Sequence, residues 1–176
     1  MDWYVVDKTY FARLFDADEK VGFIEYGDRL KLHVGVVLEF ENTKYYLPIS
    51  SPKDKHTRMS NGKDFHKIVD PKTNQLYAVI NINNMIPVPD ECITQLKYNQ
   101  VCLFRSFSSE KERTDYIYLL QKEIDIINDI ADILKDKAQN LRELYERNPS
   151  SRLSQRCCNF PLLENIAKEY IKERET

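Results

Sequence analysis

The apolar residues between Ser109 and Pro149 recur at alternating spacings of three and four positions, and this stripe constrains the fold more than any other feature. Its members are Ile117, Leu120, Ile124, Ile127, Ala131, Leu134, Ala138, Leu141 and Tyr145. This spacing places them on one face of an α-helix, and no Pro or Gly interrupts them. We expect helix from Ser109 onward, as one rod or as two consecutive helices. Another helix is predicted to begin near Pro161 and to extend through Ile171.

The residues before Ser109 carry strand patterns instead. The clearest is in residues 31–49, where two apolar runs, 31–40 and 44–49, flank Glu41-Asn42-Thr43 and predict an antiparallel hairpin. Residues 34–38 scarcely alternate, which indicates a central strand covered on both faces. Thr9 is the predicted N-cap of a short helix at 10–15, and the polar residues between Pro52 and Asp64 predict a long loop. Further strands are expected at residues 3–6, 76–82, 84–88 and 92–96.

Strands followed by helices in this order are typical of an α+β fold with a mostly antiparallel sheet. The length of 176 residues fits one domain, so a single domain is expected over residues 1–176. No apolar run is long enough to cross a membrane and the N-terminus does not resemble a signal peptide, so we expect a cytoplasmic protein without membrane contact. The four cysteines and three histidines lack metal-site spacing, so reduced thiols and no metal or cofactor are expected.

Positive charge is concentrated in the middle of the chain. The net charge is −2, yet residues 44–72 contain 7 basic and 3 acidic side chains. These basic residues, with two histidines among them, are candidates for a phosphate-binding surface: Lys44, Lys53, Lys55, His56, Arg58, Lys63, His66, Lys67 and Lys72. Charge alone favours the alternative, an ordinary solvated loop.

Ser50-Ser51-Pro52-Lys53 stands where the hairpin meets this basic segment. Two hydroxyls and an ammonium suit the binding of a phosphate oxyanion, because hydroxyls donate hydrogen bonds and lysine supplies charge. Ordinary turn chemistry explains the same residues and is favoured when this motif is taken by itself. The usual nucleotide-binding motifs are absent, and the chain has only 4 Gly from which to build them.

Five stretches of the sequence together resemble the ToxN/AbiQ family, the endoribonuclease toxins of type III toxin–antitoxin systems. They are Lys8-Thr9-Tyr10, residues 31–39, residues 44–53, residues 81–88 and residues 157–164. The resemblance implies a compact fold with a strongly twisted antiparallel sheet and flanking helices, similar to the Kid/MazF-like toxins.

The resemblance also implies metal-independent RNA cleavage. A ribose 2′-hydroxyl would attack the adjacent phosphate and leave a 2′,3′-cyclic phosphate and a 5′-hydroxyl. The implied catalytic residues are Tyr10, Lys31, Ser50, Ser51 and Lys53. The two lysines would stabilise the phosphate, Ser51 would donate a hydrogen bond or relay a proton, and Tyr10 would position a base or bind a phosphate. These side chains are therefore expected to converge on one phosphodiester.

The implied partner is a cognate antitoxin, a small pseudoknot-like RNA that binds the toxin in a closed protein–RNA assembly, and the implied substrates are cellular or phage RNA in abortive infection. Predicted RNA contacts, besides the segment 44–72, are Arg105, Lys111, Arg152 and Arg156. Two alternatives stay open. One is a non-catalytic RNA-binding module, and the other is an interaction protein that uses the stripe from Ile117 to Tyr145 as a coiled-coil seam.

Two positions depart from the family pattern as we interpret it. Asp54 and Lys55 follow Lys53 where another basic residue and an aromatic one are expected, which puts contacts from both positions in doubt. His33 stands where an apolar strand residue is common. We interpret it as a buried histidine with its hydrogen bonds satisfied, and a position facing the cleft beside Lys31 is the alternative.

Overall fold

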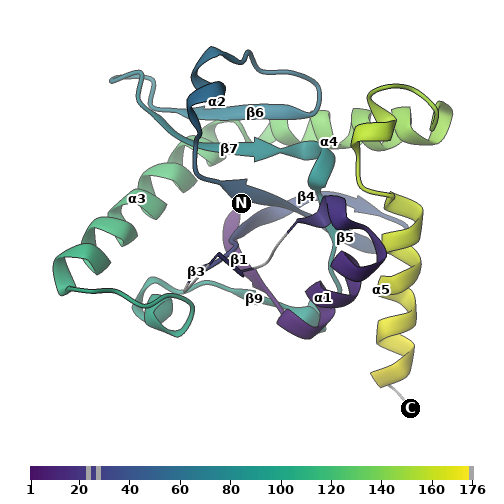
Figure 1. The fold of residues 1–176 in the computed structure, drawn as a ribbon, viewed down its shortest axis with the longest axis horizontal. Coiled ribbons are helices and arrows are strands. Elements are labelled where there is room, and N and C mark those ends of the chain that lie inside the picture. The colour runs from purple at the N-terminus through teal and green to yellow at the C-terminus, as the bar shows by residue number, and fades with distance from the viewer. Residues whose placement is uncertain (23–24, 27–28, 175–176) are drawn as a thin grey trace.

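The computed structural model describes residues 1–22, 25–26 and 29–174 (Figure 1). Its strands are β1 (Asp2–Val6), β2 (Glu25–Tyr26), β3 (Arg29–Leu30), β4 (His33–Phe40), β5 (Thr43–Ser50), β6 (Phe65–Val69), β7 (Leu76–Asn81), β8 (Ile86–Pro87) and β9 (Ile93–Gln95). Its α-helices are α1 (Lys8–Ala17), α2 (Asp54–Arg58), α3 (Glu110–Asp129), α4 (Ala131–Arg147) and α5 (Phe160–Arg174). The expected order of strands followed by helices is confirmed.

Seven strands form one antiparallel sheet in the order β6-β7-β5-β4-β1-β9, with β8 paired to β5 off this path. β2 and β3 pair only with each other. In Figure 1, β6 and β1 point in clearly different directions, as strands do when a twisted sheet accumulates rotation from one strand to the next. The α+β class with a mostly antiparallel sheet is therefore confirmed.

The predicted hairpin is β4 and β5. Its turn is two residues long, and both Glu41 and Asn42 have positive φ angles (46° and 64°), as a type I′ turn requires. Thr43 already pairs with Phe40, so the turn is one residue shorter than expected. β4 lies between β5 and β1. Val34 and Val37 are buried, which confirms the prediction of a central strand.

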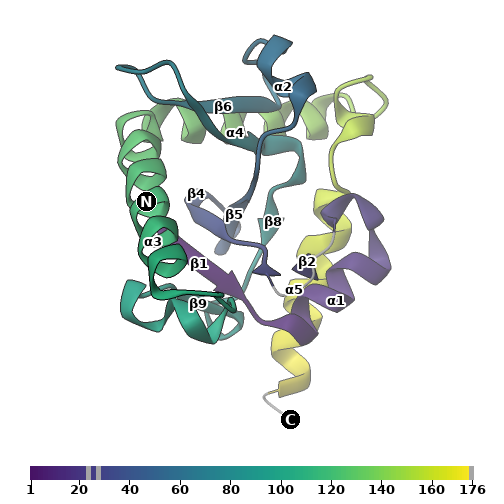
Figure 2. The ribbon, with the colours of Figure 1, turned by 60° about the vertical axis from the view of Figure 1, so that its left-hand side comes forward.

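The helical half packs around the sheet. Figure 2 shows α3 and α4 along two sides of the sheet and α5 with α1 along a third. A break at Ile130 separates α3 from α4, so the stripe belongs to two consecutive helices. Its central residues are buried in the same hydrophobic core as the strands: Leu120, Ile127, Leu134, Ala138 and Leu141. The stripe therefore packs on the sheet, and these residues leave no seam for a coiled-coil partner.

Several local predictions need correction. Asp7 caps α1, because its carboxylate accepts the backbone N–H of Tyr10 at 2.9 Å, and Thr9 lies inside the helix. The expected loop contains α2. β6 was not predicted, because its sequence is short and has two polar residues in the middle. The expected strand at 84–88 is reduced to β8, which pairs with β5 and not with β7. The strands near residues 3–6 and 92–96 and the helix near Pro161 are confirmed.

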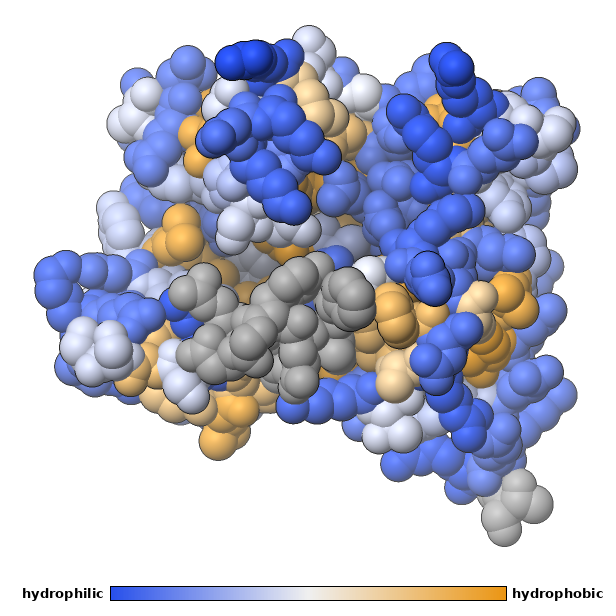
Figure 3. Space-filling model, viewed as in Figure 1, coloured by the Kyte–Doolittle hydropathy of each residue, from blue (hydrophilic) through white to orange (hydrophobic). Residues whose placement is uncertain are grey.

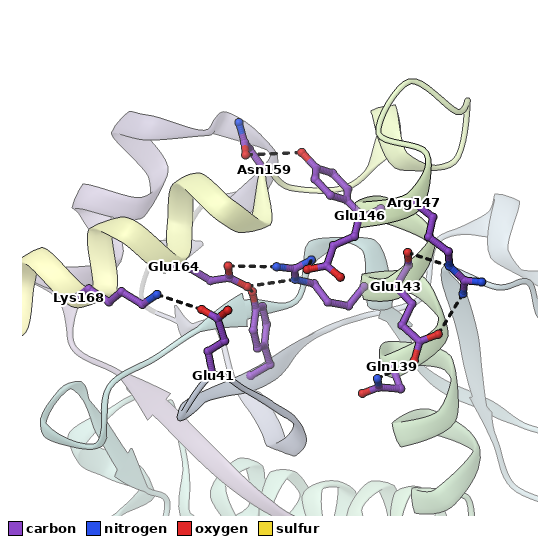
Figure 4. Close-up of polar contacts among 11 residues, drawn as sticks. Glu41, Gln139, Glu143, Glu146, Arg147, Asn159, Glu164 and Lys168 are labelled. Carbon is purple, nitrogen blue, oxygen red and sulfur yellow. Dashed lines mark hydrogen bonds and ion pairs between the residues drawn. The ribbon is translucent and has the colours of Figure 1, made fainter.

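A buried polar cluster joins α4, α5 and β5 (Figure 4). Arg142 donates two hydrogen bonds to the carboxylate of Glu164, from Nε at 3.0 Å and from Nη2 at 3.1 Å. The hydroxyl of Tyr45 donates to the same carboxylate. All three side chains are buried. Arg142 also pairs with the half-exposed Glu146 at 2.9 Å, but Arg142 is the one cation that the described residues offer Glu164, so removing it leaves the Glu164 carboxylate buried without a counter-ion.

No helix within the described ranges is both long and apolar enough to cross a lipid bilayer.

Arg142→Ala is expected to lower the free energy of unfolding by about 3–5 kcal/mol, because Glu164 then stays buried without its cation. Arg147→Ala is the control on the same helix. Its partner Glu143 lies 3.0 Å away in an exposed pair, and its loss should cost less than about 1 kcal/mol. Urea unfolding of both variants measures the difference. Equal losses would contradict the structural role assigned to the buried cluster.

Candidate active site

A cavity of about 380 Å³ lies between one face of the sheet and helix α3, and we call it the α3 cavity. Apolar residues of the sheet and the helix line it: Trp3, Ile49, Ala78, Leu119 and Leu120. Polar side chains from four separate segments also line it: Lys31, Ser50, Ser51, Lys53, Arg105 and Glu123. Four of the five residues predicted to be catalytic therefore lie around one cavity.

The end of β5 positions the two serines. Ile49 pairs with Ile80 and Ser50 pairs with Val79, both on β7. No residue of the strand pairs beyond Ser50, so Ser51 leaves the sheet with an exposed side chain. The sheet thus fixes the backbone next to Ser51 while its hydroxyl stays accessible at the cavity.

Lys53 is held at the start of α2. Its backbone N–H donates to Nδ1 of His56 at 3.0 Å, and its carbonyl accepts the N–H of His56 at 2.8 Å. The His56 side chain is 7% exposed and its ring packs against Phe65, with 5.6 Å between the centroids. Burial lowers the pKa of His56, with Lys55 and Lys53 contributing. The His56 ring is thus mostly buried where it supports the backbone of Lys53, and its contact with RNA stays a prediction.

Lys31 lines the α3 cavity and also reaches the chain segment that follows the 3-10 turn Glu19–Val21. Its Nζ lies next to Gly22, where an added Cβ would be 3.3 Å away. Burial lowers the pKa of Lys31. His33 follows as a buried residue, 1% exposed, and burial lowers its pKa to about 3, with the charge of Lys31 adding to the effect. The expectation of a buried histidine is confirmed, but its Nδ1 has no hydrogen-bond partner among the described residues, so it is not fully satisfied.

Arg105 enters the α3 cavity from the segment that precedes α3. Its guanidinium stacks on two aromatic rings, 4.2 Å from the centroid of Tyr116 and 5.0 Å from that of Phe107. Glu112 accepts a hydrogen bond from Nη2 at 3.0 Å. Arg105 was predicted as an RNA contact at a helix end. The structure brings it to the same cavity as Ser51 and Lys53, with its orientation fixed by stacking and by one ion pair.

Glu123 is the cavity residue that our sequence analysis missed. It lies on α3 and is 6% exposed. Burial raises the pKa of its carboxyl group to about 8. The sequence does carry a signal, because Glu123 follows Leu120 by three positions and precedes Ile127 by four. This spacing places an acidic residue on the buried face of the helix.

Tyr10 does not line the α3 cavity. Its side chain is 0% exposed, its hydroxyl donates to the carbonyl of Pro87 at 2.7 Å, and its ring packs edge-on against Tyr170 at 5.1 Å. Burial raises its pKa far above the ordinary value. The expectation that Tyr10 joins the two lysines and serines is corrected, because the packing of α1 against α5 places its ring in the core.

The other predicted RNA contacts are spread over the surface. Lys44 pairs with Asp90 at 2.7 Å and Arg156 pairs with Asp64 at 2.5 Å. Figure 3 shows strongly hydrophilic side chains gathered over α2. The exposed basic residues in and after this region are Lys55, Arg58, Lys63 and, beyond α4, Arg152. Contact of these residues with RNA stays a prediction.

In the part of the chain that the structure describes, no three His, Cys, Asp or Glu side chains form a group that could hold a metal ion. The polar side chains of the α3 cavity are mainly hydroxyls and cations, which are suited to binding anionic phosphate oxygens.

Residues 2–168 match the model of the toxin ToxN family of type III toxin–antitoxin systems. The endoribonuclease ToxN of Pectobacterium atrosepticum is 28% identical, over 99% of this chain and 96% of its own length. The endoribonuclease AbiQ of Lactococcus lactis subsp. lactis is 25% identical, over 97% and 90%.

Solved structures agree with this match. A protein from a bacterial antiviral system that a processed non-coding RNA regulates aligns with a TM-score of 0.79 and 25% identity, over 96% of this chain and 98% of that one. AbiQ, a lactococcal anti-phage endoribonuclease, has the same fold, with a TM-score of 0.79 at 21% identity over 97% and 98% of the two chains. Because the family model matches residues 2–168, nearly the whole chain, this chain belongs to the ToxN family of toxins of type III toxin–antitoxin systems.

Proposed function

We propose that this chain is an endoribonuclease toxin that cleaves RNA without a metal ion. The 2′-hydroxyl of one nucleotide attacks the adjacent phosphate and displaces the 5′-oxygen of the next, which leaves a 2′,3′-cyclic phosphate and a 5′-hydroxyl. The observation that carries the proposal is the gathering of Ser50, Ser51, Lys53 and Arg105 around one cavity. The family membership supports it, since relatives across most of the chain are named endoribonucleases.

Each of these residues has a role that its chemistry allows. Lys53 and Arg105 bind the scissile phosphate and offset the negative charge that grows on its oxygens in the transition state. Ser51, exposed at the end of β5, donates a hydrogen bond to a phosphate oxygen. Lys31 adds positive charge to the same cavity, and Ser50 fixes the strand end. No phosphoserine intermediate is needed, because the RNA supplies its own nucleophile.

We expect regulation of the nuclease activity to act on the surface around the α3 cavity. We infer that a small structured antitoxin RNA, with a pseudoknot-like fold, covers the α3 cavity and the exposed basic residues Lys55, Arg58 and Lys63. Protein and RNA alternate in a closed assembly, and release of the toxin exposes cellular or phage RNA to cleavage. This places the protein in the cytoplasm, where such RNA is found. A relative of known structure, regulated by a processed non-coding RNA, supports this inference.

Ser51→Ala is expected to reduce RNA cleavage by about 10²–10³-fold, the usual cost of one lost donor to an oxyanion. RNA affinity should change little. Ser60→Ala, an exposed serine of the same segment, is the matched control and should cleave normally. Cleavage is measured in EDTA, with identification of the fragment ends. Full activity of Ser51→Ala, or 5′-phosphate ends that depend on metal, would contradict the proposal.

RNA binding should weaken steeply with salt, because phosphate contacts release counterions. Between about 50 and 200 mM salt, the Kd of the Ser51→Ala protein for RNA should rise at least about tenfold. Adding Lys55→Gln and Arg58→Gln should lower the slope of log Kd against log salt by about 0.7 for each lost contact. Lys168→Gln, on α5 and paired with Glu41, is the control. A Kd independent of salt would exclude a basic RNA-binding surface.

A further inference from the structure

Glu123 reaches the α3 cavity from the helix that forms its far wall. The indole N–H of Trp3 donates to the carbonyl of Leu120 at 3.0 Å, which anchors α3 to β1 beside the cavity. Trp3 and Leu120 both line the cavity, and Glu123 follows one turn later on the same face of the helix. The anchor therefore holds the part of α3 from which Glu123 lines the same cavity as Ser51 and Lys53.

The carboxyl group of Glu123 differs from that of Glu164, the other buried glutamate among the described residues. Arg142 and Tyr45 satisfy Glu164 with hydrogen bonds. For Glu123, no described residue provides a hydrogen bond or an ion pair, and burial is the only cause of its raised pKa. A largely buried carboxyl group that pairs with none of the described residues costs stability, so its packing alone does not account for it.

Proton transfer is the one task that the proposed site leaves unassigned. Besides Glu123, the residues lining the α3 cavity that titrate or carry charge are Lys31, Lys53, Arg105 and Tyr116. No histidine lines the cavity among the described residues. The pKa of Glu123, about 8, keeps its proton bound at neutral pH. It is therefore the acid of this cavity that holds a transferable proton near the working pH.

We propose that Glu123 is the general acid of the cleavage reaction. The 2′-oxygen forms a bond to phosphorus and its proton passes to solvent water. The bond between phosphorus and the 5′-oxygen breaks, and the carboxylic acid of Glu123 donates its proton to that oxygen. The resulting carboxylate regains a proton from water before the next turnover. This assignment rests on the proposed endoribonuclease function.

The pH dependence of the cleavage rate follows from the direction in which the pKa of Glu123 is shifted. Because the pKa is raised, the acid form predominates below pH 8 and is lost as the pH rises through that value. The cleavage rate should therefore fall above about pH 8, provided that departure of the 5′-oxygen limits the rate.

The test compares two RNA substrates that differ in one atom. One has an ordinary phosphodiester, and the other has sulfur in place of the bridging 5′-oxygen at the cleavage site. A thiolate leaves without a proton. E123Q should cleave the ordinary RNA about 10²–10⁴-fold more slowly than wild type and the sulfur RNA at nearly the wild-type rate. Asp125→Asn, exposed on the same helix, should leave both rates unchanged.

The wild-type protein provides an arm that does not depend on how E123Q folds. Its rate on ordinary RNA should fall above about pH 8, and its rate on sulfur RNA should not. Equal loss of E123Q activity on both substrates, or an identical pH profile on both with wild type, would overturn the assignment. If wild type cleaves neither substrate, the endoribonuclease function itself fails.

Discussion

The pairing of β5 with three other strands is the constraint on which the rest of the structure depends. Its first residues pair with β4 and, through Tyr45 and Tyr46, with β8. Its last residues pair with β7. One strand therefore crosses the core and joins the two parts of the sheet. Because the pairing stops at Ser50, the chain leaves the sheet where the α3 cavity opens, and Ser51 directly follows backbone that the sheet holds in place.

The elements predicted correctly are those whose signal is local. The β4–β5 hairpin has a turn with two positive φ angles, and an Asn supplies one of them at low cost. The apolar stripe predicts helix, but no Gly or Pro in the sequence indicates the break at Ile130. β6 was not predicted because its second and third residues, His66 and Lys67, are polar. Its backbone hydrogen bonds come from pairing with β7, which is a separate segment. Such pairing between separate segments leaves no local pattern.

The residues of the candidate site show the same difference between local sequence signals and tertiary packing. Ser50, Ser51 and Lys53 were predicted, together with Lys31, because the family resemblance includes the motif that contains them, since the motif by itself favours an ordinary turn. Arg105 was expected only as a surface contact, since nothing in the sequence indicates that it stacks on Tyr116 beside that motif. Tyr10 was misassigned because short motifs do not reveal how α1 packs against α5. Sequence reasoning therefore identified the groups proposed to bind phosphate and missed Glu123, the proposed acid, which tertiary packing places at the cavity from α3.

The buried cluster of Arg142, Glu164 and Tyr45 also determines when β5 can acquire its buried polar partners during synthesis. Glu164 lies in α5, the last helix of the chain, and Tyr45 lies in the strand that ends at Ser50. A ribosome must translate α5 before the buried polar partners of β5 are complete. The strand that carries the proposed site thus gains its buried polar partners only after a segment far along the chain has folded against it.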